Sequence, residues 1–261
     1  MSAIDNIILI HPTKCAGTTI SNKLLKLKGY SKNKRKLYSG YKFNIFFQDN
    51  IRLFYFIINS NKKILIPTYI VFYIICLFFT LRNLIHKYKF GLTFSQGSYQ
   101  HLTYRQLKKT NDIKSNSICI TVIRHPQERI VSSYYFLGYH YHYNFIEFLK
   151  KIKSGVIISS IPFSGYKAII KQHIIPMHEY IINNENKSCV DFILRNESLK
   201  DDWRKMCYLY NIEYEPLEHI NKTRKKNNWR LLYKRYPEAI KLVYDIYEKD
   251  FQYFNYKIIN N

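Results

Sequence analysis

Two short apolar runs in the chain are each followed by a polar turn and a helical pattern. The first run, Ile7–Ile10, precedes a turn after which Ile20, Leu24 and Leu27 recur at helical spacing. The second run is Ile118–Ile123. Continuous apolar runs of this length are typical of strands buried on both faces of a parallel sheet. The pattern therefore predicts two strand–loop–helix units.

The helix of the second unit is marked by Ile130, Val131 and Tyr134. Pro126 comes directly before them and suits a first helical turn. Residues 190–194 are a third strand candidate. Near the end of the chain a further helix is indicated by an apolar stripe of Ile240, Val243, Tyr244 and Tyr247. No repeat or low-complexity linker divides the chain, so we expect one domain spanning residues 1–261.

A long apolar stretch runs from Ile64 to Leu81 between the two units. Its length approaches the ~20 apolar residues that a transmembrane helix needs. A full crossing would put the two units on opposite sides of a bilayer, although their chemistry suggests that they share a ligand. We therefore expect a buried helical insertion at about residues 45–90, and we keep membrane contact through Ile64 to Leu81 as the alternative.

Composition adds one strong feature, a formal net charge of +23 over 261 residues. Such a charge favours anionic partners, but the chain is rich in Lys, Asn, Ile and Tyr throughout, so nucleic acid is not the expected partner. The five cysteines are odd in number and lack a paired C-x-x-C spacing, so neither a disulfide framework nor a metal site is predicted. The first strand starts near residue 6 without a charged and apolar leader. We expect no cleavable signal peptide and a cytoplasmic or membrane-associated protein.

The first loop, residues 11–19, has the chemistry of an anion site. A loop that leads from a buried strand into a helix presents unpaired N–H groups at the positive end of the helix dipole. Lys14 supplies a mobile charge, Gly17 permits close backbone approach, and Thr18 and Thr19 supply hydroxyl groups. The spacing does not match the Walker nucleotide-binding loop. A plain strand-to-helix turn with a surface lysine is the alternative for this loop alone.

The second loop offers a matching pair of side chains. Arg124 follows the second strand and Ser132 lies on the next helix, so a guanidinium and a hydroxyl could hold a phosphate. Ligands of open parallel sheets bind at the carboxyl ends of the strands. Two such loops on neighbouring strands predict one ligand with two phosphate-like ends.

Five blocks of the chain together resemble a known family, the carbohydrate sulfotransferases that use 3′-phosphoadenosine 5′-phosphosulfate (PAPS), in the group of the heparan 2-O, chondroitin and HNK-1-type enzymes. Residues 11–19 resemble the family's 5′-phosphosulfate loop, and residues 124–134 resemble its 3′-phosphate segment. Residues 195–202, residues 219–223 and the final helix and tail follow in the family's order. Cys15 and His125 depart from it, because the family usually has Thr and Asp there.

The resemblance implies an α/β, P-loop-like, three-layer fold with a central parallel sheet flanked by helices. It implies sulfuryl transfer from PAPS to a carbohydrate hydroxyl, without a metal. Lys14 would stabilise the leaving phosphate oxygen, and His101, in the block between the two loops, would be the catalytic base. The residues expected to bind PAPS are Lys14, Cys15, Ala16, Gly17, Thr18, Thr19, Arg124, Ser132 and Lys222.

Two other function classes remain open at this point. A nucleotide-dependent phosphotransferase would explain the phosphate loop, but the chain lacks the Walker Lys-Ser/Thr pair. A non-enzymatic basic protein that binds nucleic acid or a membrane surface would explain the charge, but it would leave both loops as coincidence. Neither the acceptor nor the oligomeric state can be read from the sequence.

Overall fold

Three strands form one parallel sheet in the computed structural model, which describes residues 3–29, 101–159, 164–218 and 228–260. The strands β1 (Ile7–Ile10), β2 (Ile118–Ile123) and β3 (Phe192–Arg195) lie side by side in that order. Their register sets Ile7 opposite Ile118, and Ile120 opposite Phe192. The first two strands have the predicted bounds, and the α/β class is confirmed.

The third strand begins two residues later than the sequence pattern predicts. The backbone N–H of Asp191 donates to the carbonyl of Cys119, over 2.7 Å. The Cys119 N–H, however, donates to the Asp191 side-chain carboxylate, also over 2.7 Å. Because a side chain replaces the backbone carbonyl at this point, the regular ladder starts only at Phe192.

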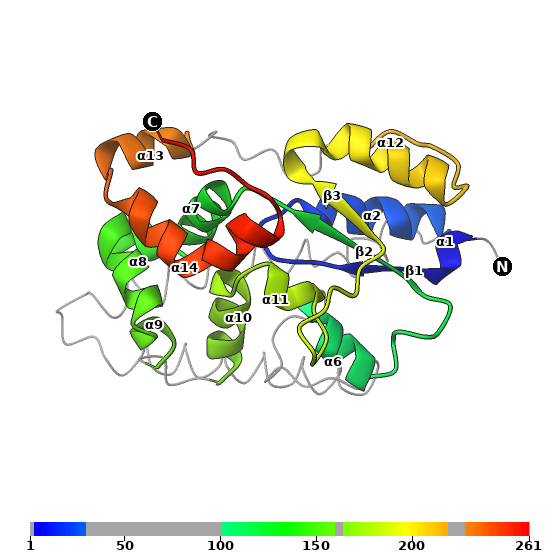
Figure 1. Ribbon diagram of the computed structural model, residues 1–261, viewed down its shortest axis with the longest axis horizontal. Helices are drawn as coiled ribbons and strands as arrows, with labels where there is room; N and C mark the ends of the chain where they lie inside the picture. The colour runs from blue at the N-terminus through cyan, green and yellow to red at the C-terminus, as the bar shows by residue number, and fades with distance from the viewer. Residues whose placement is uncertain (1–2, 30–100, 160–163, 219–227, 261) are drawn as a thin grey trace, which may run out of the picture.

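Helices cover the sheet and extend beyond it (Figure 1). Figure 1 shows α2 and α12 on one side of the sheet, and α6 and α11 on the other, which gives the predicted three layers. The helices are α1 (Ala3–Asn6), α2 (Gly17–Leu27), α6 (Tyr104–Lys109), α7 (Pro126–Phe136), α8 (Phe145–Lys153), α9 (Val156–Ser159), α10 (Ser164–Ile174), α11 (His178–Ile181), α12 (Leu199–Leu209), α13 (Trp229–Arg235) and α14 (Ala239–Tyr253), with short 3-10 turns η3 (Tyr139–Tyr141) and η4 (Asn196–Ser198).

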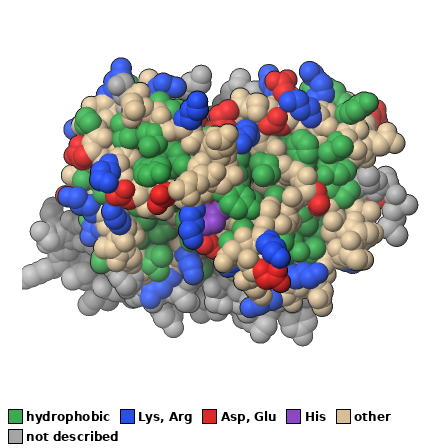
Figure 2. All heavy atoms as spheres, viewed as in Figure 1, with side chains coloured by type: hydrophobic (Ala, Val, Ile, Leu, Met, Phe, Trp, Pro, Cys, Tyr) green, Lys and Arg blue, Asp and Glu red, His purple; other side chains and the backbone are tan. Residues whose placement is uncertain are grey.

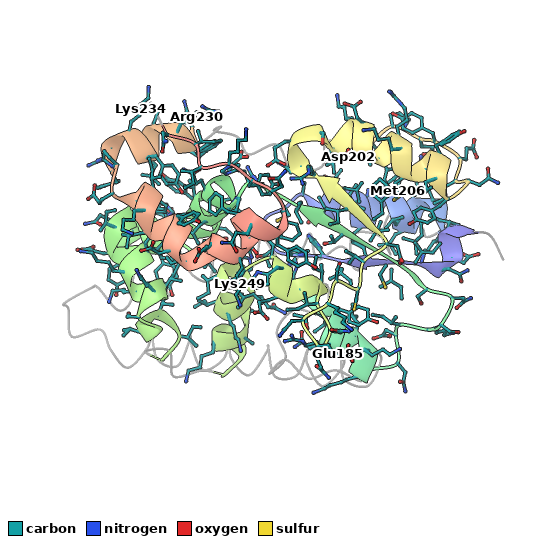
Figure 3. The ribbon with its side chains drawn as sticks, in the orientation of Figure 1. Glu185, Asp202, Met206, Arg230, Lys234 and Lys249 are labelled. Carbon is teal, nitrogen blue, oxygen red and sulfur yellow. The ribbon has the colours of Figure 1, made fainter. Side chains whose placement is uncertain are left out.

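The apolar side chains form two adjoining cores. The sheet core joins the three strands to α12, where Trp203 and Met206 are fully buried and Met206 points toward the sheet (Figure 3). The second core packs α7, α8, α10, α13 and α14 together. Val243 and Tyr247, two members of the predicted stripe, are buried in it. Because α7 starts at the end of β2 and packs in the second core, it fixes the second loop against both cores.

Parallel strands bring the two loops to one edge of the sheet. The last residue of β1, Ile10, pairs with Thr121, whose hydroxyl also donates to the Ile10 carbonyl over 2.9 Å. The chain leaves β1 at His11 and leaves β2 at Arg124. The two loops predicted to bind anions therefore start beside each other.

The predicted insertion at residues 45–90, with the apolar stretch from Ile64 to Leu81, lies outside the described residues. Among the helices of the described ranges, none combines the length and the apolarity needed to cross a membrane.

Candidate active site

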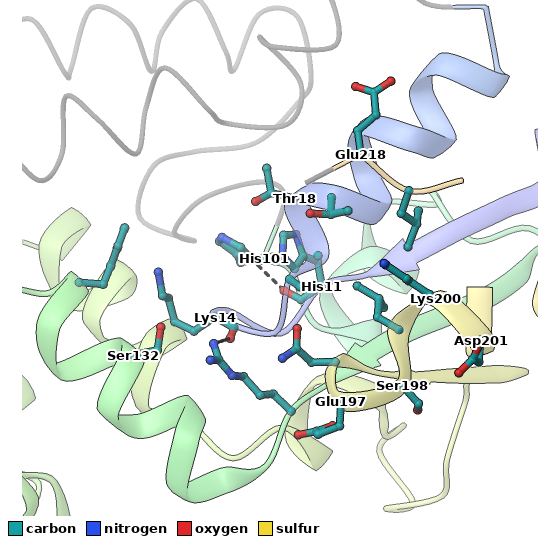
Figure 4. A pocket seen from close by; sticks show the side chains of 18 of the residues that line it. His11, Lys14, Thr18, His101, Ser132, Glu197, Ser198, Lys200, Asp201 and Glu218 are labelled. Atoms are coloured by element: carbon teal, nitrogen blue, oxygen red, sulfur yellow. Dashed lines mark hydrogen bonds between the residues drawn. The ribbon is translucent and has the colours of Figure 1, made fainter. Parts of the chain in front are cut away.

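A cavity of about 520 Å³ opens at the carboxyl ends of β1 and β2. Figure 4 shows Lys14 and Ser132 on one side of it and Ser198 and Lys200 on the other, with His11 and His101 between them. Its volume is in the ~300–1,000 Å³ range of ligand pockets. The lining residues are His11, Lys14, Ala16, Gly17, Thr18, Thr19, His101, Arg124, Ser132, Phe136, His173, Asn196, Glu197, Ser198, Leu199, Lys200, Asp201, Leu217 and Glu218.

The backbone of the first loop is bent into an unusual shape. Lys14 and Ala16 have φ angles of 64° and 67°, in the left-handed region that residues with a side chain rarely adopt. Ala16 is also the N-cap of α2, and its side chain cannot cap the helix. The first N–H groups of α2 therefore keep their capacity to bind a ligand. A left-handed bend at a helix start makes the kind of concavity that binds anions.

Gly17 is required by the close approach of a histidine. A Cβ atom added at Gly17 would overlap the imidazole ring of His11. His11 is itself buried, and burial together with the neighbouring His101 holds its pKa well below the usual value. A neutral His11 ring therefore packs against the start of α2 and helps to fix the loop.

A buried arginine holds the first loop through hydrogen bonds to its backbone. The Arg129 side chain is 1% exposed, and its Nε donates to the Thr13 carbonyl over 3.1 Å. Its Nη1 donates to the Ile175 carbonyl over 2.8 Å. The Cys15 side chain points into the core, where its fully buried thiol lies 3.5 Å from the Met177 sulfur. Cys15 thus faces the core with its side chain and can offer a ligand only its backbone.

Lys14 extends from the loop along the cavity wall. Its Nζ lies 4.0 Å from the centre of the Phe136 ring, in a cation–π contact. Burial and the nearby Arg124 lower the pKa of Lys14 to about 8. An anion bound beside Lys14 would favour its charged form.

Arg124 connects the two loops directly. Its Nη1 donates to the Lys14 carbonyl over 3.0 Å, and its Nη2 donates to Glu128 over 2.6 Å. The Nε atom is buried and has no hydrogen-bond partner within the described part of the chain. Ser132 lines the cavity from α7, four residues after Glu128. The structure therefore places Arg124 and Ser132, the two residues predicted to bind the 3′-phosphate, in the same cavity as Lys14.

His101 lies beside the first loop. Its Nδ1 is 2.9 Å from the His11 carbonyl oxygen, which can only accept, so Nδ1 carries the proton (dashed line in Figure 4). The Nε2 atom of His101 is therefore the unprotonated one. Burial lowers the pKa of His101 to about 4, so the ring is neutral near pH 7.

The second loop has a regular helix start. Pro126 is the first residue of α7, as predicted, and His125 is its N-cap. The Nδ1 atom of His125 accepts from the Gln127 N–H over 3.3 Å. The N–H of His125 itself donates to Glu197 over 2.6 Å. The histidine that replaces the family's Asp thus performs the capping role.

The structure also places residues at the cavity that the sequence analysis missed. Phe136 and His173 come from α7 and α10, and Asn196, Ser198 and Lys200 come from the segment after β3. No motif distinguishes Phe136 or His173 from ordinary core residues. The block at residues 195–202 resembles a block of the family, but the resemblance assigned no function to its residues. Lys222 lies outside the described residues.

Comparison with protein families gives a match. A family model described as the sulfotransferase family matches residues 1–257. Neither the curated proteins nor the solved structures compared with the chain give a match.

Proposed function

This chain belongs to the sulfotransferase family, and from that premise we propose that it transfers a sulfuryl group from PAPS to a hydroxyl of a carbohydrate. One observation carries the proposal. A single cavity is lined by the loop after β1, by Arg124 and Ser132 of the second unit, and by His101. These groups supply binding for two anionic ends and a proton acceptor in one place.

The residues fit such a donor at both of its anionic ends. The N–H groups from Ala16 to Thr18, with the charge of Lys14, suit the 5′-phosphosulfate. Arg124 and Ser132 suit the 3′-phosphate, and the buried Nε of Arg124 has a donor to offer. Lys222, outside the described residues, stays a predicted donor-binding residue. Backbone donors dominate at the first end, so Cys15 in place of Thr is tolerated.

Within this proposal the chain's groups act as follows. His101 Nε2 accepts the proton of the acceptor hydroxyl, whose oxygen forms a bond to the sulfur. The bond from sulfur to the bridging phosphate oxygen breaks in line with it, and that oxygen takes the negative charge. Lys14 stabilises this charge as it develops. Two products leave, a sulfate ester and 3′-phosphoadenosine 5′-phosphate.

Electrostatics supports this division of labour. His101 is kept neutral by burial, by Lys14 and by Arg129, so it can accept a proton near pH 7. The negative charge of a bound donor would raise the His101 pKa and make it a stronger base. Lys14 would leave the Phe136 ring for the phosphate, because a full negative charge attracts an ammonium more strongly than a ring does.

The face drawn in Figure 2 does not favour the nucleic-acid alternative. Figure 2 shows Lys and Arg side chains spread over one face with acidic side chains between them. Arg230 and Lys234 point away from the body on α13 (Figure 3). A nucleic-acid site would gather such charges in a stripe.

A thermal-shift panel tests the donor. We expect 3′-phosphoadenosine 5′-phosphate to raise the melting temperature, because a ligand at ~100 times its dissociation constant adds ~2.7 kcal/mol of stability. ATP with magnesium and duplex DNA should have little effect. A shift with ATP and magnesium alone would support the phosphotransferase, and a shift with DNA alone would support the basic binding protein. Transfer of radiolabelled sulfate from PAPS to a mixed glycan pool then tests the reaction.

A further inference from the structure

A second histidine shares the cavity wall with His101. His173, on α10, lines the same cavity and is 5% exposed. The ring centroids of His101 and His173 are 6.1 Å apart, and the rings meet edge to face. His173 also stacks on Phe136, with centroids 4.7 Å apart. The ring that holds Lys14 therefore orients His173 as well.

Both histidines are held in the same tautomer. The Nδ1 of His173 is 2.8 Å from the Ile169 carbonyl oxygen, as the Nδ1 of His101 is 2.9 Å from the His11 carbonyl oxygen. A carbonyl oxygen can only accept, so Nδ1 carries the proton in both rings. Each Nε2 is then an acceptor, and neither makes a hydrogen bond within the described part of the chain.

Their surroundings keep both rings neutral. Burial and the charges of Lys14 and Arg129 hold the pKa of each below its usual value. The cavity therefore presents two fixed acceptors side by side, next to the lysine of the first loop. Two neighbouring acceptors match two neighbouring hydroxyl donors.

We propose that His173 is an acceptor-binding residue that determines specificity: the sugar presents two neighbouring hydroxyls, one to His101 for sulfation and the next to His173. This inference rests on the proposed function. The hydroxyl at His173 donates a hydrogen bond to Nε2 and keeps its proton, whereas the hydroxyl at His101 gives its proton to the His101 Nε2 as its oxygen bonds to sulfur. A sugar that lacks the second hydroxyl leaves the Nε2 of His173, a residue only 5% exposed, without a partner.

The test compares acceptors that differ by one oxygen. The probes are methyl hexopyranosides and their monodeoxy derivatives, with PAPS as donor and mass spectrometry to locate the sulfate. For the wild-type enzyme, removal of one hydroxyl adjacent to the sulfated position should lower kcat/KM by about 10-fold or more. Removal of a hydroxyl elsewhere on the ring should have a smaller effect.

Two variants assign the effect to His173. The variant His173→Phe keeps a ring to stack on Phe136. Its kcat/KM for the acceptor that lacks the adjacent hydroxyl should lie within about twofold of its kcat/KM for the intact acceptor. The acceptor KM should rise about 10-fold, while the affinity for 3′-phosphoadenosine 5′-phosphate stays the same. His178→Asn is the control, because it changes another buried histidine, one that pairs with Asp250 outside the cavity. In this variant, removal of the adjacent hydroxyl should lower kcat/KM as much as in the wild type.

The outcomes are distinct from those of the proposed function. If no acceptor is sulfated and PAPS does not bind, the proposed function fails, and this inference fails with it. If sulfation occurs but no adjacent deoxy acceptor is impaired in the wild type, only this inference is overturned. The inference is also overturned if, in His173→Phe, removal of the adjacent hydroxyl still lowers kcat/KM as much as in the wild type. The wild-type comparison needs no variant, so a variant that does not fold leaves that test intact.

Discussion

The loop after β1 and the loop after β2 have the same order of elements, but their helices begin differently. At the start of α2 the N-cap is Ala16, in a left-handed conformation without a side-chain cap. At the start of α7 the N-cap is His125, which accepts from Gln127 N–H, while Glu197 accepts from the His125 N–H. The first loop leaves the Gly17 and Thr18 amides for a ligand. In the second loop the His125 and Gln127 amides already donate within the protein, so this loop binds a ligand through its side chains.

The charges around the two loops differ in the same sense. The first loop rests on the buried Arg129, which meets backbone carbonyls and the Thr13 hydroxyl. Arg124 of the second loop is paired with Glu128, over 2.6 Å. One loop is therefore a fixed, positive main-chain site, and the other is an adjustable side-chain site. Changes of backbone shape should affect the first, and removal of side chains should affect the second.

The largest effect is expected from Gly17→Ala. The added methyl group would overlap the His11 ring, so the loop must shift, and overpacking of this kind costs about 1–3 kcal/mol of stability. A displacement near 1 Å at reacting groups can cost ~10²-fold, so we expect activity to fall by at least that factor. Steady-state kinetics and a binding titration with 3′-phosphoadenosine 5′-phosphate measure it.

Gly29→Ala is the matched control, because a Cβ there meets no atom within 4 Å and Gly29 has a φ of 79°. It should cost about 1 kcal/mol of stability from the left-handed conformation, with donor binding unchanged. Equal losses of donor binding in both variants would show that the effect is general destabilisation, not the shape of the loop.

An effect on turnover alone is expected from Lys14→Ala, which leaves the backbone of the first loop in place. If Lys14 stabilises charge that appears only as the bond breaks, kcat should fall by ~10²–10³ while donor affinity changes much less. Lys14→Arg should restore little, because a planar fork does not replace a compact ammonium. Lys26→Ala, an exposed lysine of α2 paired with Glu215, is the control and should retain kcat. A large rise in the donor dissociation constant with preserved kcat would make Lys14 a binding residue only.

A smaller effect is expected from pH. The base must be neutral, so activity is lost as pH falls through the His101 pKa of about 4. Lys14 must be charged, so activity is lost as pH rises through its pKa of about 8. The profile of kcat/KM should therefore be bell-shaped, falling about tenfold per pH unit beyond each limb. In Lys14→Arg the alkaline limb should disappear, and its persistence would assign that limb to another group.

The sequence was sufficient for the elements whose pattern is local. Continuous apolar runs predicted β1 and β2 to the residue, and Pro126 predicted the start of α7. The third strand was displaced because the Asp191 side chain takes the place of a backbone carbonyl, which no pattern of apolar residues reveals. Motif order predicted the family.

The sequence could not predict contacts between distant helices. His173 reaches the cavity only because α10 packs against α7, and Phe136 contacts both Lys14 and His173 from there. The bond from Arg124 to the Lys14 carbonyl joins residues in different loops. The Lys14 and Arg129 charges that help to keep His101 neutral come from residues distant in sequence.

The claim that both loops hold one ligand is tested most directly by a calorimetric comparison of 3′-phosphoadenosine 5′-phosphate with adenosine 5′-phosphate. The wild type should prefer the 3′-phosphorylated nucleotide by about 10–100-fold, since a hydrogen bond to a charged group contributes ~1.5–3 kcal/mol. In Arg124→Ala this preference should largely vanish, while Arg105→Ala, a change to an arginine that bonds to the Asn183 carbonyl outside the cavity, should keep it. Equal affinity of the wild type for the two nucleotides, or a preference that survives in Arg124→Ala, would contradict the account.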